Sequence, residues 1–323
     1  MIDRPIIAHT DVRAFAECYV NLRREDAKEY RDQVNRLREK LEQFIKDHPD
    51  YGLVKMLLSG SLAKGTALRT INDVDIAIYI KEGIAPTREK DLLDWLADKL
   101  RQAYPQMRAD QIRPCDHCVR ISFCGTGLDV DVVPVHYEGD PDWRGYLVER
   151  QTGKRVLTSI PMHLSFIRKR KDAQPDHFAQ VVRLVKWWVK QRKADDESFR
   201  FKSFMVEMVV AHVADGGCVL SDYPLALERV FAYIVKSGMK QRIAFSDYYP
   251  ASELPPPTGE AIEVFDPVNA RNNAAVGYSQ HDRAVLVDKA DDALSAIAEA
   301  AYATTKERAV ECWQIVFGPS FRG

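Results

Sequence analysis

The sequence predicts an α+β protein in which a mixed sheet flanked by helices forms one lobe and a mainly helical segment forms a second. Short β-branched apolar runs alternate with helical patterns between residues 50 and 137, and from residue 161 on the apolar periodicity is almost entirely helical. The 323 residues, 46% of them hydrophobic and 29% charged, suffice for two domains. We therefore expect one lobe over residues 1–160 and a second over residues 161–323.

The first lobe is expected to begin with a long amphipathic helix over residues 21–48, where apolar residues recur mostly at i, i+3/i+4 spacing in a highly charged segment. Residues 53–58 predict a strand that leads into the turn Ser59–Ser61. The β-branched run 74–80 predicts another strand. Residues 92–100 resume helical spacing, so helices are expected on both sides of these strands in the sequence.

A hairpin is expected next, with strands over residues 119–123 and 128–135 around a glycine-containing loop. In the second lobe, a Pro-rich loop at 254–257 is expected to lead to a short strand over residues 261–265. The expected helices of this lobe cover residues 162–171, 178–192, 203–215, 225–235 and 282–304.

The net charge and the lack of a recognisable leader or membrane span limit the classes of protein to which this sequence can belong. A net charge of −1 gives no overall attraction to nucleic acid. No secretory leader or window as long as a membrane span occurs, so we expect a cytoplasmic protein without membrane contact. The six cysteines are expected to be reduced thiols. Cys115 and Cys118 have a metal-like spacing, but a single C-x-x-C pair is better explained as incidental thiols.

The stretch LLSGSLAKGTALRTINDVDIAIY, residues 57–79, contains a glycine-rich turn that resembles a P-loop in spacing only. A Walker loop places a lysine directly after its second glycine, where it reaches the β and γ phosphates. Gly60 and Gly65 have the correct spacing, but Thr66 stands at the lysine position and Lys64 comes too early. The stretch therefore does not predict a Walker ATPase.

Two pairs of aspartates lie on expected strands. Asp73 and Asp75 are two residues apart in an extended segment, so their side chains point to one side. Adjacent carboxylates repel each other unless a cation lies between them, and hard oxygen ligands suit Mg²⁺. Asp129 and Asp131 alternate in the same way and supply a third carboxylate. Three carboxylates can hold two Mg²⁺ ions about 4 Å apart, an arrangement suited to in-line phosphoryl transfer.

The glycine turn completes this pattern. Gly60 permits a close backbone approach, and Ser61, at the expected start of a helix, can give its hydroxyl and backbone N–H to a phosphate oxygen. A D-x-D pair alone is more often a solvent-facing strand edge. The order of a strand, G-S-x-x-x-G-T, D-x-D and a further aspartate on an apolar strand instead predicts an active or ancestral nucleotidyltransferase site.

These residues resemble the signature of polymerase-β-type nucleotidyltransferases, and more narrowly that of the bacterial cGAS/DncV-like enzymes (CD-NTases), relatives of oligoadenylate synthase. The resemblance covers nearly the whole chain. It implies a polymerase-β-like catalytic lobe, residues 1–160, packed on a helical nucleotide-binding lobe, residues 161–323, with the active site in the cleft between them. Asp129 falls outside the family pattern. The matching residues are Gly60-Ser61 and Gly65-Thr66 in the turn, Asp73 and Asp75 as the first two metal carboxylates, and Asp131 as the third.

The second lobe carries two further matches. VVRLVKWWVK resembles the family helix whose lysine contacts the triphosphate, which implies that role for Lys186; a surface lysine is the alternative. FKSFMVEMVVAHVAD resembles the helix start at which a serine touches phosphate and the next aromatic stacks on the base. This implies Ser203 and Phe204, with core packing as the alternative for Phe204.

A third match lies in VFDPVNARNNAA, which is similar to the Asp-Pro and Asn-Asn segment of the family. Asp266, Asn272 and Asn273 stand in the matching places. The resemblance places them beside the cleft, where Asp and Asn side chains can equally serve only to shape a loop.

The motifs SGSLAKGTALR, GLDVDVVPV, PDWRG, HFAQVVRL and FRFKSFM resemble the group encoded in anti-phage (CBASS) operons beside HORMA-domain proteins and an AAA+ ATPase. The resemblance implies cyclisation of ATP to cyclic tri-adenylate with two Mg²⁺ ions, or Mn²⁺. It also implies activation by a HORMA partner, with DNA as a further candidate activator. It leaves open a mixed-base cyclic or linear product, modification of RNA or protein, and a non-catalytic nucleotide sensor.

Overall fold

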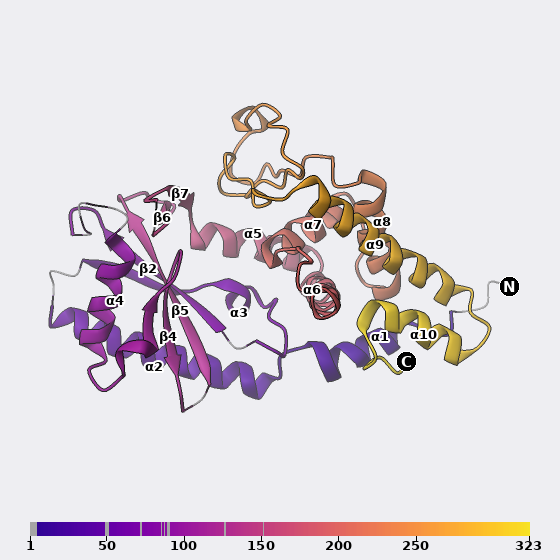
Figure 1. Cartoon of the computed structure of the whole chain (residues 1–323), viewed down its shortest axis with the longest axis horizontal. Helices are drawn as coiled ribbons and strands as arrows, with labels where there is room; N and C mark the ends of the chain where they lie inside the picture. The colour runs from indigo at the N-terminus through magenta and orange to yellow at the C-terminus, as the bar shows by residue number, and fades with distance from the viewer. Residues whose placement is uncertain are drawn as a thin grey trace. The chain divides into compact units, whose positions relative to one another are not determined.

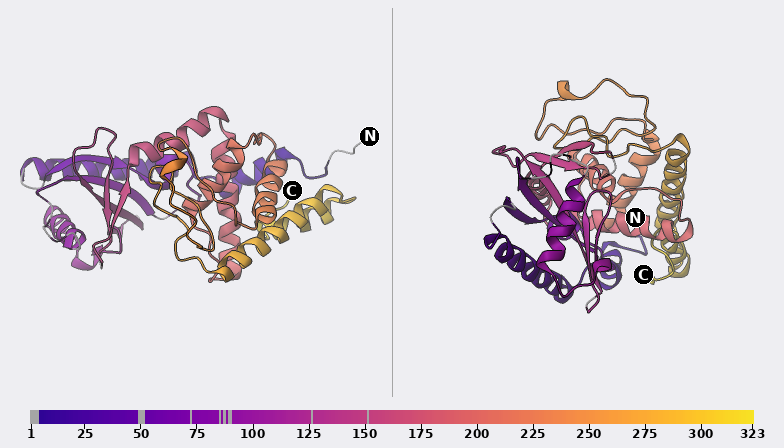
Figure 2. Two further views of the ribbon diagram at one scale, coloured as in Figure 1. Left: turned by 90° about the horizontal axis from the view of Figure 1, so that it is seen from above. Right: turned by 60° about the vertical axis from the view of Figure 1, so that its left-hand side comes forward.

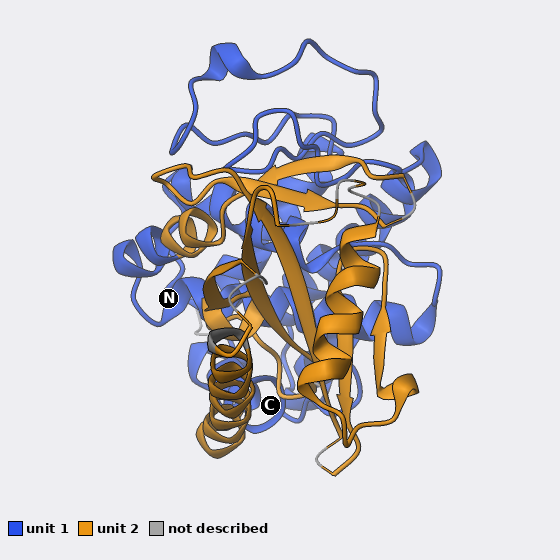
Figure 3. Cartoon of the chain, turned by 90° about the vertical axis from the view of Figure 1, so that its left-hand side faces the viewer, with its two compact units in different colours: residues 1–21, 168–323 blue, residues 22–167 orange. Residues whose placement is uncertain are grey.

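The computed structural model describes residues 5–48, 52–71, 73–84, 86, 88, 91–125, 127–150 and 152–323. The chain forms two compact units, Leu22–Ile167 and Met1–Asn21 together with Arg168–Gly323 (Figure 3). This division differs in two respects from the expected lobes, 1–160 and 161–323. The N-terminal segment belongs with the helical unit, and the second boundary falls inside a helix.

The N-terminal segment joins the helical unit through aromatic packing. α1 (His9–Phe15) is followed by a π-helical turn, η1 (Ala16–Val20). Phe15 is buried and stacks on Phe317 with ring centroids 5.0 Å apart. This contact joins positions far apart in the sequence, and local periodicity carries no information about it.

The first unit is built on a mixed sheet (Figure 1). Its strands are β1 (Leu53–Leu58), β2 (Asp73–Lys81), β3 (Ile112–Pro114), β4 (Val119–Phe123), β5 (Leu128–Tyr137), β6 (Gly145–Val148) and β7 (Arg155–Thr158). The order is β1-β2-β5-β4-β3, with β6 pairing with β5 and β7. β2 and β5 pair in parallel, whereas the other neighbours pair antiparallel. The expected strands and hairpin of the first lobe are confirmed.

Strand alternation gives the sheet two different faces. Val74, Ile76 and the residues that follow at every second position of β2 point to one face. There they form a buried core with α2 (Arg24–Lys46) and α4 (Leu92–Ala103), the two helices expected from the sequence. The intervening residues of β2, which include its two aspartates, point to the opposite face.

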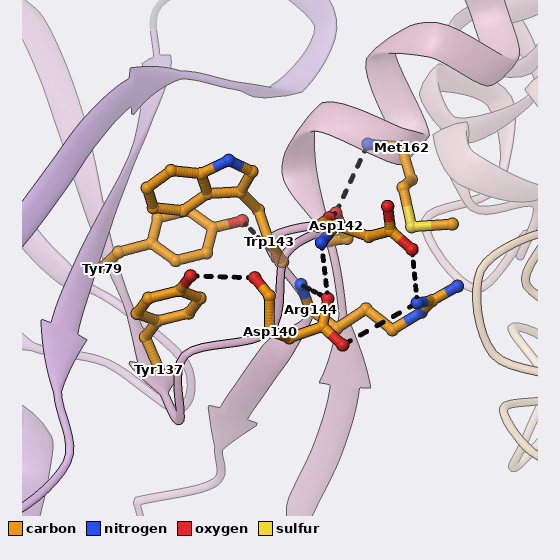
Figure 4. A network of polar contacts seen from close by, with 8 residues as sticks. Tyr79, Tyr137, Asp140, Asp142, Trp143, Arg144 and Met162 are labelled. Atoms are coloured by element: carbon orange, nitrogen blue, oxygen red, sulfur yellow. Dashed lines mark hydrogen bonds and ion pairs between the residues drawn. The ribbon is translucent and has the colours of Figure 1, made fainter.

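A network of aromatic and polar side chains covers the carboxyl-terminal end of β2 on that opposite face (Figure 4). Trp143, with a φ of 58°, stacks on Tyr137 at a ring-centroid distance of 5.0 Å. The Tyr79 hydroxyl donates to the Trp143 carbonyl oxygen, and the Asp140 carboxylate accepts from the backbone N–H of Arg144. The PDWRG motif therefore fixes a turn against β2 and β5, at the end of these strands remote from the aspartates.

The second unit is mainly helical, and Figure 2 shows its last two helices, in yellow, side by side. The helices are α6 (His177–Asp195), α7 (Ser203–Asp215), α8 (Tyr223–Ser237), α9 (Gln280–Ala301) and α10 (Lys306–Phe317), while α5 (Ile160–Ala173) spans the boundary between the units. The expected helices are confirmed, and α10 was not predicted. Among the helices in the described part of the chain, none is both long and apolar enough to cross a membrane.

The strand predicted over residues 261–265 is wrong. Among the described residues of this segment, pairing is limited to isolated bridges, from Ile243 to Val264 and from Phe265 to Asn273. The β-branched residues are buried, but their neighbours are loops. A run of high β propensity needs a partner strand of comparable length before it can form a ladder.

Candidate active site

Four aspartates lie on one face of two adjacent parallel strands. In the register of β2 and β5, Asp73 pairs with Asp129 and Asp75 pairs with Asp131. Because residues two apart on a strand share a face, all four carboxylates belong to the face opposite the α2/α4 core. The structure therefore brings together the three aspartates that the sequence singled out and adds Asp129 beside them.

The glycine turn packs directly against this cluster. α3 (Gly60–Lys64) follows β1, so Ser61 lies at a helix start as predicted, and the Ser59 backbone N–H donates to the Asp75 carbonyl oxygen at 2.8 Å. Gly60 has a φ of +65°, and a Cβ atom there would lie 1.7 Å from Oδ2 of Asp75. Glycine is required here because any side chain would displace the carboxylate.

The carboxylates destabilise one another when ionised. Burial raises the pKa of Asp75 to about 6, and the negative charges of Asp73 and Asp131 add to the shift. Burial, and then the charge of Asp131, also raise the pKa of Asp73 above its ordinary value. Opposing these effects, Lys64 and Arg120 lower the pKa of Asp75. A cluster of this charge favours a bound cation, and its oxygen donors are those that Mg²⁺ prefers.

Asp131 is held by an arginine that the sequence analysis did not single out. Arg120 on β4 donates from Nε to Oδ1 and from Nη2 to Oδ2 of Asp131, both at 2.7 Å. In the part of the chain that the structure describes, no group of three or more His, Cys, Asp or Glu side chains is placed to hold a metal ion. Asp73 and Asp75 fit a divalent cation in donor chemistry, whereas the oxygens of Asp131 are engaged by the guanidinium group.

Arg120 could have been found from the sequence. The predicted hairpin has a four-residue loop, which places Phe123 opposite Leu128. Counting three residues away from the loop on each strand then places Arg120 opposite Asp131, on the same face of the sheet.

The raised pKa of Asp75 predicts that Asp75→Asn stabilises the metal-free chain. With a folded-state pKa of about 6 and an unfolded value of 3.8, ionisation of Asp75 lowers the free energy of unfolding as pH rises through this interval, and the loss is complete above it. We expect the variant to exceed wild type by about 2–3 kcal/mol at pH 7.5 and to equal it below pH 4. Urea unfolding in EDTA across this pH range measures the difference, and equal stability at pH 7.5 would contradict the account.

Lys186, predicted to contact a triphosphate, lies in a buried ion pair. Its Nζ donates to Oε1 of Glu207 at 2.7 Å, between α6 and α7, and both side chains are almost fully buried. The alternative of a surface lysine is therefore wrong, because this ammonium group is not solvated. Glu207 was not singled out, although it lies one helical turn after Ser203 on α7 and its charge among buried apolar residues was a usable signal.

Ser203 and Phe204 open α7. Ser203 is the first residue of the helix and is exposed, while Phe204 is half-buried. An exposed hydroxyl in the first turn of a thirteen-residue helix, where backbone N–H groups point outward, suits an anion. A contact of these two residues with a nucleotide stays a prediction.

Asp266, Asn272 and Asn273 form bonds within their own loop. The Asn272 side chain donates to Oδ2 of Asp266, whose Oδ1 accepts from the Val268 N–H. Asn273 accepts from the backbone N–H groups of Val264 and Ala275. These contacts fit the loop-shaping alternative, and a role beside a nucleotide stays a prediction.

The cysteines are all free thiols, including Cys115 and Cys118. These two lie in the turn between β3 and β4, where the Cys115 N–H donates to the Cys118 carbonyl oxygen at 2.7 Å. Burial raises the pKa of Cys118, which keeps this thiol protonated. The turn also places Arg120 at its position on β4.

Comparison with known families identifies the first unit. The family described as nucleotidyltransferase domain matches residues 34–116. This segment contains Asp73 and Asp75 and ends before Asp131. The match therefore covers the glycine turn and the first two carboxylates of the cluster.

Two relatives match along almost the whole chain. A cyclic AMP-AMP-AMP synthase from Escherichia coli (strain MS 115-1) is 48% identical over 317 residues, which are 98% of each protein. A CBASS oligonucleotide cyclase, CdnC, from Escherichia coli (strain KTE188) is 29% identical over 325 residues, again 98% of each.

Solved structures show the same fold. The structure of E. coli MS115-1 CdnC with ATP matches with a TM-score of 0.92, and that of its complex with HORMA-deltaN with a TM-score of 0.91. In both cases the identity is 48%, and the match covers 98% of this chain and 99% of the other. The predicted α+β nucleotidyltransferase fold is thereby confirmed.

The match at 48% identity spans nearly the full length of both proteins, so both units of this chain belong to the same family as this relative. The glycine turn and the two aspartates of β2 lie in the part that the nucleotidyltransferase match and the whole-chain matches share, whereas β5 lies only in the part that the whole-chain matches cover. The chain therefore belongs to the CD-NTase family of nucleotidyltransferases, which includes the CBASS oligonucleotide cyclases.

Proposed function

We propose that this chain joins and cyclises ATP into cyclic tri-adenylate, with release of pyrophosphate, as a second messenger of anti-phage defence in the cytoplasm. The observation that carries the proposal is the carboxylate cluster of β2 and β5 packed against Gly60. The 48% identity to a cyclic AMP-AMP-AMP synthase supports the choice of base and ring size.

The carboxylates on β2 and β5 prepare the transfer step. Asp73 and Asp75, with Asp131 once it turns from Arg120, would provide the oxygen ligands for two Mg²⁺ ions, or for Mn²⁺. When bound, such ions lower the pKa of an attacking hydroxyl and neutralise the triphosphate and departing pyrophosphate. The raised pKa values of Asp73 and Asp75 mean that their ionised forms are destabilised, and a bound cation would relieve this.

Each unit carries residues that we propose contact nucleotide. Ser61 at the start of α3 is proposed to donate to a phosphate oxygen of the donor ATP. From the helical unit, Ser203 is proposed to contact the triphosphate and Phe204 to stack on the base. Lys186 is also proposed to contact the triphosphate, for which its ammonium group would have to leave the buried ion pair with Glu207. The acceptor ribose hydroxyl then gives its proton to water and attacks the α-phosphorus, while the bond to pyrophosphate breaks and pyrophosphate leaves with the bonding electrons. Repetition and a final intramolecular attack close the ring.

Gly60→Ala tests how closely the turn must approach Asp75. The new methyl group would overlap Oδ2 of Asp75, and a displacement of about 1 Å at a catalytic group costs about 100-fold in rate. We therefore expect product formation to fall by at least about 100-fold in an initial-rate assay. Gly83→Ala is the matched control, since Gly83 also has a positive φ, of +83°, with nothing within 4 Å of its Cβ position. Equal activity of the two variants would contradict the assigned role of Gly60.

The proposed partners follow from the solved relatives. CdnC of E. coli MS115-1 has been solved with ATP and with HORMA-deltaN, so we propose ATP as substrate and a HORMA-domain protein as activator of this chain. An AAA+ ATPase as regulator and DNA as a further activator are proposed from the family resemblance alone.

The deciding experiment incubates the purified chain with each of the four NTPs and Mg²⁺, with and without the HORMA protein and DNA. Mass spectrometry is expected to show, from ATP, a phosphatase-resistant product with the mass of three AMP units without added water. A linear or mixed-base product would correct the proposal within its class. Transfer of label from α-labelled ATP to RNA or protein, or no product with every activator present, would overturn it.

A further inference from the structure

We propose that Arg120 is the resident counter-cation of Asp131 in the metal-free chain and competes with divalent metal for this carboxylate. The proposal rests on the metal-dependent transfer proposed above and adds a residue that controls its metal affinity. The structural basis is the bidentate contact of the Arg120 guanidinium group with Asp131, with both N···O distances at 2.7 Å.

This contact engages both oxygens of the Asp131 carboxylate. Nε and Nη2 of Arg120 each donate to a different oxygen of Asp131, and the Asp131 side chain is only 12% exposed. A bidentate, charge-assisted pair of this kind is stronger than a neutral hydrogen bond. A cation that takes Asp131 as a ligand therefore competes with the positively charged guanidinium group for the same two oxygens.

The position of Arg120 is fixed by the sheet rather than by a flexible loop. Antiparallel pairing of β4 and β5 places Arg120 directly opposite Asp131. The face that receives the guanidinium group is the carboxylate face, where burial, and then the charges of Asp73 and Asp131, raise the pKa of Asp75. In the absence of metal, Arg120 on β4 thus supplies the positive charge that compensates the carboxylate of Asp131 on β5.

Asp129 provides a second position for the displaced guanidinium group. Nη1 of Arg120 lies 3.7 Å from Oδ2 of Asp129, two residues before Asp131 on the same face of β5. A small side-chain movement moves Arg120 from the one carboxylate toward the other without leaving an unpaired charge. This assigns a role to Asp129, which lies outside the metal-ligand pattern: it receives Arg120 when Asp131 turns to the metal.

The test measures Mn²⁺ binding to the full chain without nucleotide, by electron paramagnetic resonance of free Mn²⁺. We expect Arg120→Gln to bind Mn²⁺ at least about tenfold more tightly than wild type. Arg113→Gln is the matched control, because Arg113 pairs with Arg120 on the neighbouring strand β3 and is exposed, and its loss changes the net charge equally. The control is expected to change affinity by less than about twofold.

Two further variants separate displacement from simple charge. Arg120→Lys keeps the positive charge, but an ammonium group cannot make the bidentate contact with both oxygens of Asp131. We therefore expect this variant to bind Mn²⁺ more tightly than wild type. Asp129→Asn is expected to weaken binding in the wild-type background and to have little effect in the Arg120→Gln background. A persistent effect there would make Asp129 a direct ligand and would overturn the role given to it.

The proposal is overturned if Arg120→Gln binds Mn²⁺ no more tightly than Arg113→Gln, binds it more weakly than wild type, or shows no measurable binding. Weaker binding would mean that Arg120 holds Asp131 in its ligating position. Circular dichroism and thermal unfolding of each variant confirm that folded chains are compared. Because the readout uses no nucleotide, its failure is distinguishable from failure of the cyclisation assay.

Discussion

Asp73→Asn and Asp75→Asn are each expected to reduce product formation by at least about 10³-fold, equivalent to about 4 kcal/mol of activation barrier. The two side chains project from one face of β2 next to Asp131, and transfer of a nucleotidyl group depends almost entirely on positioning and charge stabilisation. Initial rates with ATP, Mg²⁺ and activator measure the loss.

Two controls make this result specific. Asp98→Asn removes a carboxylate from the exposed surface of α4 and is expected to leave the rate unchanged. Unfolding curves in EDTA should show Asp75→Asn to be at least as stable as wild type, since the ionised carboxylate destabilises the metal-free fold. Retention of more than a tenth of wild-type activity by either active-site variant would favour the non-catalytic sensor that the sequence leaves open.

Lys186→Met is expected to lower the free energy of unfolding by about 3–5 kcal/mol. The substitution removes the cation that neutralises Glu207, and an uncompensated buried carboxylate is costly in this range. Urea unfolding at pH 7.5 measures the effect.

The double variant Lys186→Met, Glu207→Leu is the matched control for this ion pair. Replacing both partners by apolar groups of similar size leaves no buried charge, so most of the lost stability should return. If the double variant is folded but inactive, the ammonium group is needed for the reaction and not only for the fold. A single variant that loses less than 1 kcal/mol would contradict the buried, paired environment of Lys186.

Local patterns explain what the sequence predicts correctly. The alternation that places Asp73 and Asp75 on one face, and the glycine that permits the turn at Gly60, depend only on neighbouring residues. The helices and the strands of the first lobe follow from the same short-range periodicity. The 261–265 strand fails because it depends on a partner that periodicity within the segment does not reveal.

Long-range pairing accounts for what the sequence does not reveal. The parallel register that places Asp75 beside Asp131 is set by the whole sheet, and the stacking of Phe15 on Phe317 joins the two ends of the chain. The Lys186–Glu207 pair depends on how α6 packs on α7. Arg120 differs from these, because the predicted hairpin already places it opposite Asp131.

A crystal structure of the chain with Mn²⁺ and a non-hydrolysable ATP analogue tests the central claim most directly. We predict anomalous difference peaks within ligand distance of Asp73 and Asp75, with an oxygen of Asp131 released from Arg120 and turned toward the metal. Peaks elsewhere, or a nucleotide bound with its phosphates away from these carboxylates, would contradict the assignment of this face as the transfer centre.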